Sequence, residues 1–244
     1  MEINPDDNHR TWAERSEEYS PEYYAEIGAN EVSETLAAVF DHYVASGAAI
    51  LELGCSSGRH LEHLRRQGYT DLTGVDLNDN SFEVMAEYFP RLIGTGTFHT
   101  GAIEEYLPTV PDDHFDVVYS VETLQHVHPD DEWVFEEVAR VGSDLVITAE
   151  NEGNSPDRGR VDSKVSTVND DFPLYHRDWK AVFSELGWRI CSVSPANAIR
   201  FACFGRFEAR STAVNGTSVS PKRGVQTPVV RSGAPIISPE NKVV

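Results

Sequence analysis

The stretch Ala49–Arg59, with the sequence AILELGCSSGR, constrains the fold more than any other part of the chain. A short apolar run is interrupted by Glu52, enters a turn of small residues and leads into an amphipathic helix expected at Arg59–Gln67. A second apolar run, Leu72–Asp76, follows and also ends in an acid. A glycine-containing turn lets the backbone approach a ligand closely, and an acid at the end of the next strand accepts ribose hydroxyls. The two runs therefore predict two strands of a nucleoside-binding α/β domain.

Strand-like and helix-like segments continue to alternate along the chain, which implies a parallel sheet covered by helices on both faces. Further strands are expected at Thr95–Thr100, Phe115–Ser120 and Asp144–Ala149, and further helices at Ser81–Phe89 and Asp131–Arg140. The polar segment 151–170 predicts a long loop. A helix at Tyr175–Leu186 and a final hairpin at Trp188–Val193 and Ile199–Ala209 are expected to complete the sheet.

The two ends of the chain differ from this central pattern. Apolar spacing predicts helices at Trp12–Tyr19 and Pro21–Val44, whereas residues 1–11 are expected to be disordered. From Arg210 the chain is rich in Ser, Thr, Gly, Pro and Val without any period, which predicts a disordered tail. We therefore divide the chain into a helical cap (1–44), an α/β domain (45–209) and a tail (210–244).

The chain is strongly acidic, with 40 Asp and Glu against 20 Lys and Arg and a formal net charge of −20. Such a surface suits a salt-rich cytoplasm, in which counterions screen self-repulsion, so we expect a halophilic source. The same charge disfavours binding to nucleic-acid phosphates. The polar N-terminus does not resemble a signal peptide, and no apolar run is long enough to span a membrane. We therefore expect a soluble cytoplasmic protein. The scattered Cys55, Cys191 and Cys203 form neither a disulfide framework nor a zinc pattern.

Three kinds of site fit the turn at Gly54–Gly58. A dinucleotide fingerprint would require glycines where the chain has Ser56 and Arg59. A serine-hydrolase elbow would use Ser56 as the nucleophile, but the upstream sequence is helical and lacks an oxyanion loop. An S-adenosylmethionine site accounts in addition for Glu52, which can organise the methionine ammonium through water.

Four motifs, in order, resemble those of the class I (Rossmann-like) S-adenosylmethionine-dependent methyltransferases. They are Leu51–Arg59, Gly74–Asn78, Gly101–Glu104 and Phe115–Val127, within a resemblance that runs from about Trp12 to Ala209. The resemblance implies a three-layer α/β/α fold around a doubly wound, mostly parallel sheet of seven strands whose last strand is antiparallel. It also implies methyl transfer with S-adenosyl-L-methionine as cofactor.

The same resemblance implies which residues hold the cofactor. Asp76 would take the ribose hydroxyls, Leu77 would pack on the adenine, and Ser56 stands where the family has a central glycine. The expected cofactor residues are Glu52, Gly54, Cys55, Ser56, Gly58, Asp76, Leu77, Ala102, Ile103 and Val121.

Candidates for the reaction itself lie near the ends of the fourth and fifth predicted strands. Methyl transfer is an in-line attack for which the protein supplies positioning and, where needed, a base. His126 is the candidate base and Glu150 a second candidate, although a loop histidine and a surface acid remain open alternatives. The candidate substrate residues are Tyr19, Tyr23, Gln125, Asn151 and Arg177, of which the last could hold a carboxylate.

We interpret the chain as a methyltransferase with a small-molecule acceptor, because it has no added recognition domain and no basic groove. No metal, nucleic-acid or membrane partner is expected, and the protein is expected to be a monomer or homodimer. The open alternatives are a non-catalytic S-adenosylmethionine- or nucleoside-binding protein and the serine hydrolase.

Overall fold

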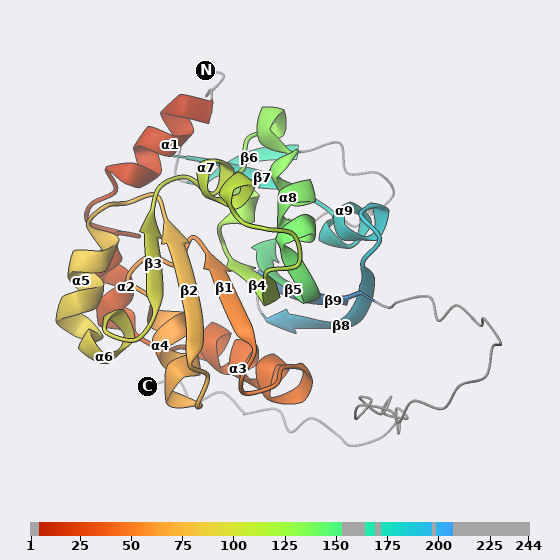
Figure 1. The fold of residues 1–244 in the computed structure, drawn as a ribbon. Helices are drawn as coiled ribbons and strands as arrows, with labels where there is room; N and C mark the ends of the chain where they lie inside the picture. Colours follow the sequence, from red (N-terminus) through yellow and green to blue (C-terminus); the bar gives the residue numbers. More distant parts are fainter. Residues whose placement is uncertain (1–4, 153–163, 169–171, 197–198, 207–244) are drawn as a thin grey trace, which may run out of the picture. The chain divides into compact units, whose positions relative to one another are not determined.

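The computed structural model describes residues 5–152, 164–168, 172–196 and 199–206 (Figure 1). Their main element is a seven-stranded sheet in the order β3-β2-β1-β4-β5-β9-β8. Its strands are β1 (Ala49–Leu53), β2 (Asp71–Asp76), β3 (Thr97–Thr100), β4 (Phe115–Val121), β5 (Gly142–Asn151), β8 (Arg189–Ala196) and β9 (Ile199–Gly205). The pairs from β3 through β5 are parallel, whereas β9 is antiparallel to both of its neighbours. The predicted mostly parallel sheet with an antiparallel last strand is confirmed.

Helices cover both faces of this sheet, which gives the predicted three layers. The α-helices are α1 (Pro5–Ala13), α2 (Pro21–Ile27), α3 (Glu31–Tyr43), α4 (Arg59–Arg66), α5 (Ser81–Tyr88), α6 (Pro90–Ile93), α7 (Ile103–Tyr106), α8 (Val134–Val141) and α9 (Trp179–Glu185). Short 3₁₀ helices are η1 (Leu107–Thr109), η2 (Leu124–His126) and η3 (Pro129–Asp131). Within the described residues, none of the helices has the length and hydrophobicity that a bilayer crossing requires.

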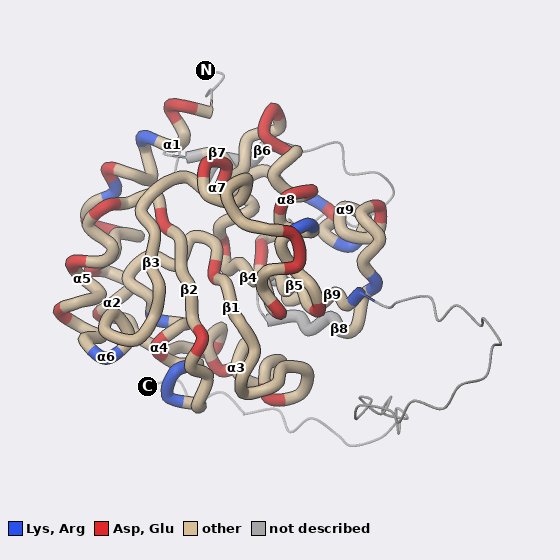
Figure 2. The backbone as a smooth tube through the Cα atoms, in the orientation of Figure 1, with Lys and Arg blue, Asp and Glu red and all other residues tan. Residues whose placement is uncertain are grey.

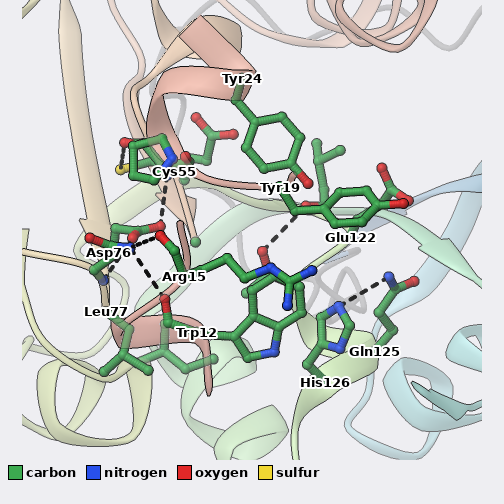
Figure 3. A pocket seen from close by; sticks show the side chains of 18 of the residues that line it. Trp12, Arg15, Tyr19, Tyr24, Cys55, Asp76, Leu77, Glu122, Gln125 and His126 are labelled. Atoms are coloured by element: carbon green, nitrogen blue, oxygen red, sulfur yellow. Dashed lines mark hydrogen bonds between the residues drawn. The ribbon is translucent and has the colours of Figure 1, made fainter. Parts of the chain in front are cut away.

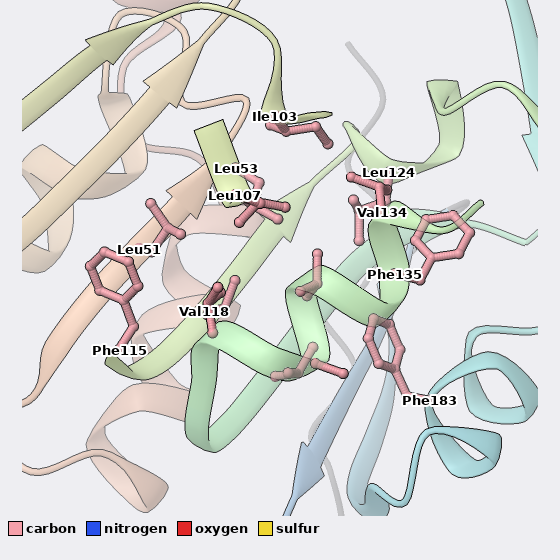
Figure 4. Packing of buried hydrophobic residues seen from close by; sticks show 14 of the residues in the cluster. Leu51, Leu53, Ile103, Leu107, Phe115, Val118, Leu124, Val134, Phe135 and Phe183 are labelled. Carbon is pink, nitrogen blue, oxygen red and sulfur yellow. The ribbon is translucent and has the colours of Figure 1, made fainter. Parts of the chain in front are cut away.

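Two hydrophobic clusters, one on each face, hold the layers together. Because side chains alternate along a strand, Leu51 and Leu53 of β1 enter one cluster while Ile50 enters the other. The first cluster joins the sheet to α7, α8 and α9 and includes Val118 and Phe183 (Figure 4). The second joins it to helices α3 to α6. The alternation in β1 thus specifies a strand that is buried on both sides.

The strand order reverses at β1, and this reversal positions the site. The chain passes from β1 to β2 and β3 on one side, then crosses to β4 and β5 on the other. The carboxyl ends of β1 and β4 therefore lie side by side with their connections leading away in opposite directions. Ligands of open α/β sheets bind at such a switch point.

The N-terminal segment differs from the sequence-based expectation. Residues from Pro5 form α1, so the prediction of disorder over residues 1–11 is wrong for the part that is described. The single helix expected at Pro21–Val44 is two helices, because the chain turns at Gly28 with φ 61° and Asn30 caps α3 through its side chain. These helices and the sheet belong to one compact unit, residues 1–208.

A second, two-stranded sheet was not predicted. Strands β6 (Lys164–Val168) and β7 (Phe172–His176) pair antiparallel where the sequence suggests a loop and then a helix from Tyr175. The helix α9 begins only after Asp178, whose side chain accepts a hydrogen bond from the amide of Ala181. The predicted tail at 210–244 and most of the predicted loop lie outside the described residues.

The turn after β1 requires glycine at its first position. Gly54 has φ 68°, and a Cβ atom there would lie 2.1 Å from Oγ1 of Thr123. We expect Gly54→Ala to lower the free energy of unfolding by about 2–4 kcal/mol, from the left-handed backbone and the steric overlap together. Gly47→Ala is the control, because a Cβ atom at Gly47 would have no neighbour within 4 Å. Urea unfolding of both variants checks this, and equal stabilities would contradict it.

Candidate active site

A cavity of about 480 Å³ opens at the carboxyl ends of β1, β2 and β4 (Figure 3). Most of the sequence-predicted residues line it. These are Glu52, Gly54, Cys55, Ser56, Asp76, Leu77, Ala102, Ile103 and Val121 of the expected cofactor set, and Tyr19, Tyr23, Gln125, His126 and Asn151 of the expected reaction set. Gly58, Glu150 and Arg177 do not line it. The fold thus brings together residues from segments far apart in the sequence.

The carboxylate of Asp76 organises the floor of the cavity. Its Oδ2 accepts a hydrogen bond from the amide of Ser56 at 2.7 Å, and its Oδ1 accepts from the Asn78 amide and the Ser81 hydroxyl, each at 2.9 Å. Burial raises the pKa of Asp76, and these three hydrogen bonds oppose that shift. Ser56 adopts φ 47°, a left-handed conformation typical of glycine. The serine therefore has the backbone conformation that a central glycine would adopt in this turn.

Glu52 lies beneath the same turn and is fully buried. Its Oε2 accepts a hydrogen bond of 2.9 Å from the Tyr119 hydroxyl on the neighbouring strand. Burial raises the pKa of Glu52 to about 8, although the Tyr119 hydrogen bond and the charge of Arg59 act in the opposite direction. At neutral pH this carboxyl group is therefore mainly protonated.

The N-terminal segment closes over the cavity and is tied to it by polar contacts. The side-chain amide of Asn78 donates to the carbonyl oxygens of Trp12 and Arg15, at 3.4 and 3.2 Å. The side-chain amide of Asn8 donates to the carbonyl of His126 at 2.6 Å, and the Trp12 and His126 ring centres are 4.4 Å apart. No pattern in the sequence predicts the roles of Asn8 and Asn78, because each depends on a partner more than 60 positions away.

His126 is held as a neutral imidazole. Its Nδ1 lies 3.1 Å from the carbonyl oxygen of Pro173, which can only accept, so Nδ1 carries the hydrogen and Nε2 the lone pair. Nε2 is 3.4 Å from the side-chain nitrogen of Gln125. Burial lowers the pKa of His126 to about 4, while the hydrogen bond to Pro173 raises it. This imidazole can accept a proton at Nε2 as a weak base.

Glu150 has a different place from the predicted one. It is completely buried and accepts hydrogen bonds from the Ser120 hydroxyl and from the amides of Thr123, Leu124 and Gln125. These amides begin η2, and the Leu124 amide also contacts the Ser120 hydroxyl at 3.4 Å. Burial raises the pKa of Glu150 to about 7, and its hydrogen-bond partners lower it. Glu150 therefore holds the turn that carries Gln125 and His126.

Arg177 and Gly58 also support the cavity from outside. Arg177 is 4% exposed, pairs with Glu132 at 2.9 Å and donates to the carbonyl of Val127 at 2.7 Å. A Cβ atom on Gly58 would lie 2.7 Å from the terminal carbon of Met85, so this glycine allows α4 and α5 to pack closely. Both contributions concern packing rather than direct contact with the cavity.

Several lining residues were missed by the sequence analysis. They include Arg15, Arg59, Glu122 and Thr123. Glu122 directly follows β4 at the switch point, so its position alone was a usable signal. Arg59 was expected only to begin an amphipathic helix.

Two other features bear on the alternatives. No histidine in the described residues forms a hydrogen bond with Ser56, so the serine-hydrolase alternative is not favoured. Among the residues that the structure describes, no group of three or more His, Cys, Asp or Glu side chains is arranged to hold a metal ion.

The raised pKa of Glu52 predicts a pH-dependent stability difference. Between pH 5 and 8 the unfolded chain ionises this carboxyl group while the folded protein keeps it protonated, so its contribution to stability falls as pH rises and is constant above the folded pKa. We expect the free energy of unfolding of the wild type to decrease by about 4 kcal/mol relative to Glu52→Gln between pH 5 and 9. Urea unfolding over this range measures the difference. The exposed Glu87→Gln is the control, and a pH-independent difference for Glu52→Gln would contradict the assignment.

Comparison with known proteins agrees with this geometry. Residues 50–143 match the family described as "Methyltransferase domain". Among curated proteins, no sequence matches the chain. The matched segment contains all four motifs in full.

Solved structures share the fold at low sequence identity. An S-adenosylmethionine-dependent methyltransferase from Mesorhizobium loti has 17% identity and a TM-score of 0.55, over 70% of this chain and 96% of that chain. A protein from Pyrococcus horikoshii OT3 has 18% identity and a TM-score of 0.59, over 79% of this chain and 100% of that chain. Magnesium protoporphyrin IX methyltransferase from Synechocystis PCC 6803, with bound SAH, has 12% identity and a TM-score of 0.59, over 83% of this chain and 94% of that chain. Residues 50–143 thus match a methyltransferase domain, and the described fold is that of solved S-adenosylmethionine-dependent methyltransferases.

Proposed function

We propose that the protein is an enzyme that transfers a methyl group from S-adenosyl-L-methionine to a small-molecule acceptor. The observation that carries the proposal is that the strand-end acid Asp76, the turn at Gly54 and the pair Ala102 and Ile103 line one cavity at the switch point of the sheet. These segments supply a carboxylate, a close backbone and an apolar surface, which fit a nucleoside with free ribose hydroxyls.

The residues at this end have distinct roles in the proposed site. Asp76 accepts the ribose hydroxyls, and Leu77, Ala102 and Ile103 flank the adenine. Glu52 lies close beneath the turn, where it orients the methionine ammonium through water. When bound, S-adenosylmethionine supplies a methyl group on an electrophilic sulfonium, so the protein needs no nucleophile of its own.

The other end of the cavity receives the acceptor. Tyr19, Tyr23, Gln125 and Asn151 line it, and the amide of Asn151 donates to Oε1 of Gln125 at 2.8 Å. His126 presents an imidazole whose Nε2 can accept a proton from the acceptor. Trp12 and the rest of the N-terminal segment cover this space, which favours a small molecule over a macromolecular surface.

The distribution of charge supports the wider assignments. Acidic positions are spread over the helices and loops around the sheet, and basic positions are fewer (Figure 2). This pattern supports a salt-rich cytoplasm as the setting and argues against a nucleic-acid substrate. We propose a monomer or homodimer. The second candidate function is a protein that binds S-adenosylmethionine without turnover. It would use the same cofactor residues but would produce no S-adenosylhomocysteine.

Calorimetric titration in high salt tests the cofactor assignment. We expect micromolar binding of S-adenosylmethionine and S-adenosylhomocysteine, and at least tenfold weaker binding by Asp76→Ala, because hydrogen bonds from the ribose to a charged acceptor contribute about 1.5–3 kcal/mol each. Asp76→Asn, which keeps the shape, should bind with intermediate affinity. The exposed Asp79→Ala serves as the control.

Two results would decide against these proposals. Wild-type affinity in Asp76→Ala would reject the ribose assignment. Failure of the folded wild type to bind either compound would reject the methyltransferase proposal. Formation of S-adenosylhomocysteine with a panel of small acceptors, read by mass spectrometry, separates the enzyme from the non-catalytic binding protein.

A further inference from the structure

The last two strands of the sheet carry two of the three cysteines of the chain. Cys191 lies on β8, the edge strand, and Cys203 lies on the neighbouring β9 (Figure 1). Both are free thiols; Cys191 is partly exposed, whereas Cys203 is only 2% exposed. A free cysteine often serves only as a small apolar side chain in a core. The position of these two thiols relative to each other indicates a chemical role as well.

An irregularity in the strand pairing brings the two cysteines together. The register pairs Ile190 with Phe204 and then Ser192 with Cys203, so Cys191 is an extra residue in β8. At such a bulge two residues of one strand oppose a single residue of the other, here Cys203. Opposed residues of antiparallel strands have Cα atoms about 4.5–5.5 Å apart, which is within the range of about 4.4–6.8 Å that a disulfide bridges.

The two side chains also lie on the same face of the sheet. Cys203 belongs to the hydrophobic cluster that joins the sheet to α3 to α6, and Cys191 packs against that cluster. The neighbouring Ile190 and Phe204 contact the cluster on the opposite face. The bulge therefore keeps both thiols on one side, where they form a hydrogen bond with each other.

The two thiols differ in acidity as well as in exposure. The hydrogen bond from Cys203 lowers the pKa of Cys191 to about 7, although partial burial acts in the opposite direction. The same hydrogen bond, together with burial, raises the pKa of Cys203. At neutral pH a substantial fraction of Cys191 is therefore thiolate, the form of cysteine that attacks electrophiles. An accessible thiolate beside a second, resolving thiol is typical of cysteines that undergo reversible oxidation.

Cys55, the third cysteine, provides an internal comparison. It is 3% exposed, and burial raises the pKa of its thiol well above the ordinary value. The nearby carboxyl groups of Asp76 and Glu52 act in the same direction. Cys55 is therefore expected to stay protonated and unreactive under conditions in which Cys191 reacts.

We propose that Cys191 and Cys203 form an oxidation site at which a hydroperoxide converts the two thiols into a disulfide between β8 and β9. In the first step the Cys191 thiolate attacks a peroxide oxygen, so that an S–O bond forms and the O–O bond breaks. The products are a sulfenic acid on Cys191 and a hydroxide or alkoxide ion. In the second step the Cys203 sulfur attacks the Cys191 sulfur, so that the S–S bond forms and the S–O bond breaks. The departing hydroxide takes the proton of Cys203 and leaves as water.

The buried partner gives this oxidation a defined end point. A sulfenic acid without a neighbouring thiol is oxidised further to sulfinic and sulfonic acids, which are not reduced by thiols. Cys203 captures the sulfenic acid first, and the resulting disulfide is reducible. Neither cysteine lines the cavity, so this chemistry is separate from the proposed methyl transfer.

The experiment treats the reduced, full-length protein with a small excess of hydrogen peroxide in high salt. We expect the intact mass to fall by the mass of two hydrogen atoms and to return after dithiothreitol treatment. Arg200 lies between the two cysteines, so trypsin separates them unless a disulfide joins their peptides. A non-reduced digest should therefore contain the linked peptides, with Cys55 still a free thiol.

Two matched variants separate the steps. Cys203→Ser keeps a hydroxyl donor beside Cys191 but cannot form the disulfide, so the sulfenic acid of Cys191, trapped with dimedone, should be roughly tenfold more abundant than in the wild type. Cys203→Ala makes the same comparison should a serine in the hydrophobic cluster prevent folding. Cys191→Ser should yield neither the disulfide nor a dimedone adduct.

A disulfide in the wild type that is absent from both variants supports the site. Uptake of oxygen at Cys191 without a disulfide, oxidation of Cys55 before Cys191, or linkage of two chains through Cys191 in place of the internal bond overturns it. Resistance of both thiols to peroxide overturns it as well and leaves them with a packing role. None of these results bears on methyl transfer, which nucleoside binding tests independently.

Discussion

The carboxylate of Asp76 is the contact on which the rest of the site depends. It ties the turn after β1, through the Ser56 amide, to the turn after β2, through the Asn78 amide and the Ser81 hydroxyl. Asn78 then uses its own side chain to hold the carbonyls of Trp12 and Arg15. One partly buried acid therefore sets the shape of two loops directly and, through Asn78, the position of the N-terminal segment.

This structural use of Asp76 is compatible with its proposed use in binding. An ionised carboxylate has about four acceptor positions, and the protein occupies three of them. Oδ2 accepts only one hydrogen bond from the described residues, which leaves capacity for a ribose hydroxyl. The hydrogen bonds that shape the loops also oppose the rise in pKa that burial causes, so they favour the charged form that binds hydroxyls best.

The sequence was sufficient for the sheet and for the residues that line the proposed nucleoside end of the cavity, because both depend on local signals. Apolar runs that end in small or acidic residues locate β1, β2 and β4, and strand order then brings Gly54 and Asp76 together. The errors arose where a long-range partner decides the outcome. Glu150 does lie at the ligand edge of the sheet, as its position after β5 implies, but its side chain satisfies the free amides of η2. Spacing along the chain identifies an edge and does not tell which neighbour a side chain will contact.

Although the chain is strongly acidic, none of the described acids forms an ion pair with the guanidinium of Arg59. Glu52 is a nearby acid, yet burial raises its pKa to about 8, so at neutral pH it is mainly uncharged and neutralises little of the guanidinium. Glu122 carries an opposite charge but is held in a strained conformation out of contact. An acidic protein could readily place a carboxylate against Arg59, and the described fold instead keeps these acids protonated or apart. The guanidinium consequently lines the cavity with a cation–π contact to Tyr24 and without an ion pair among the described residues.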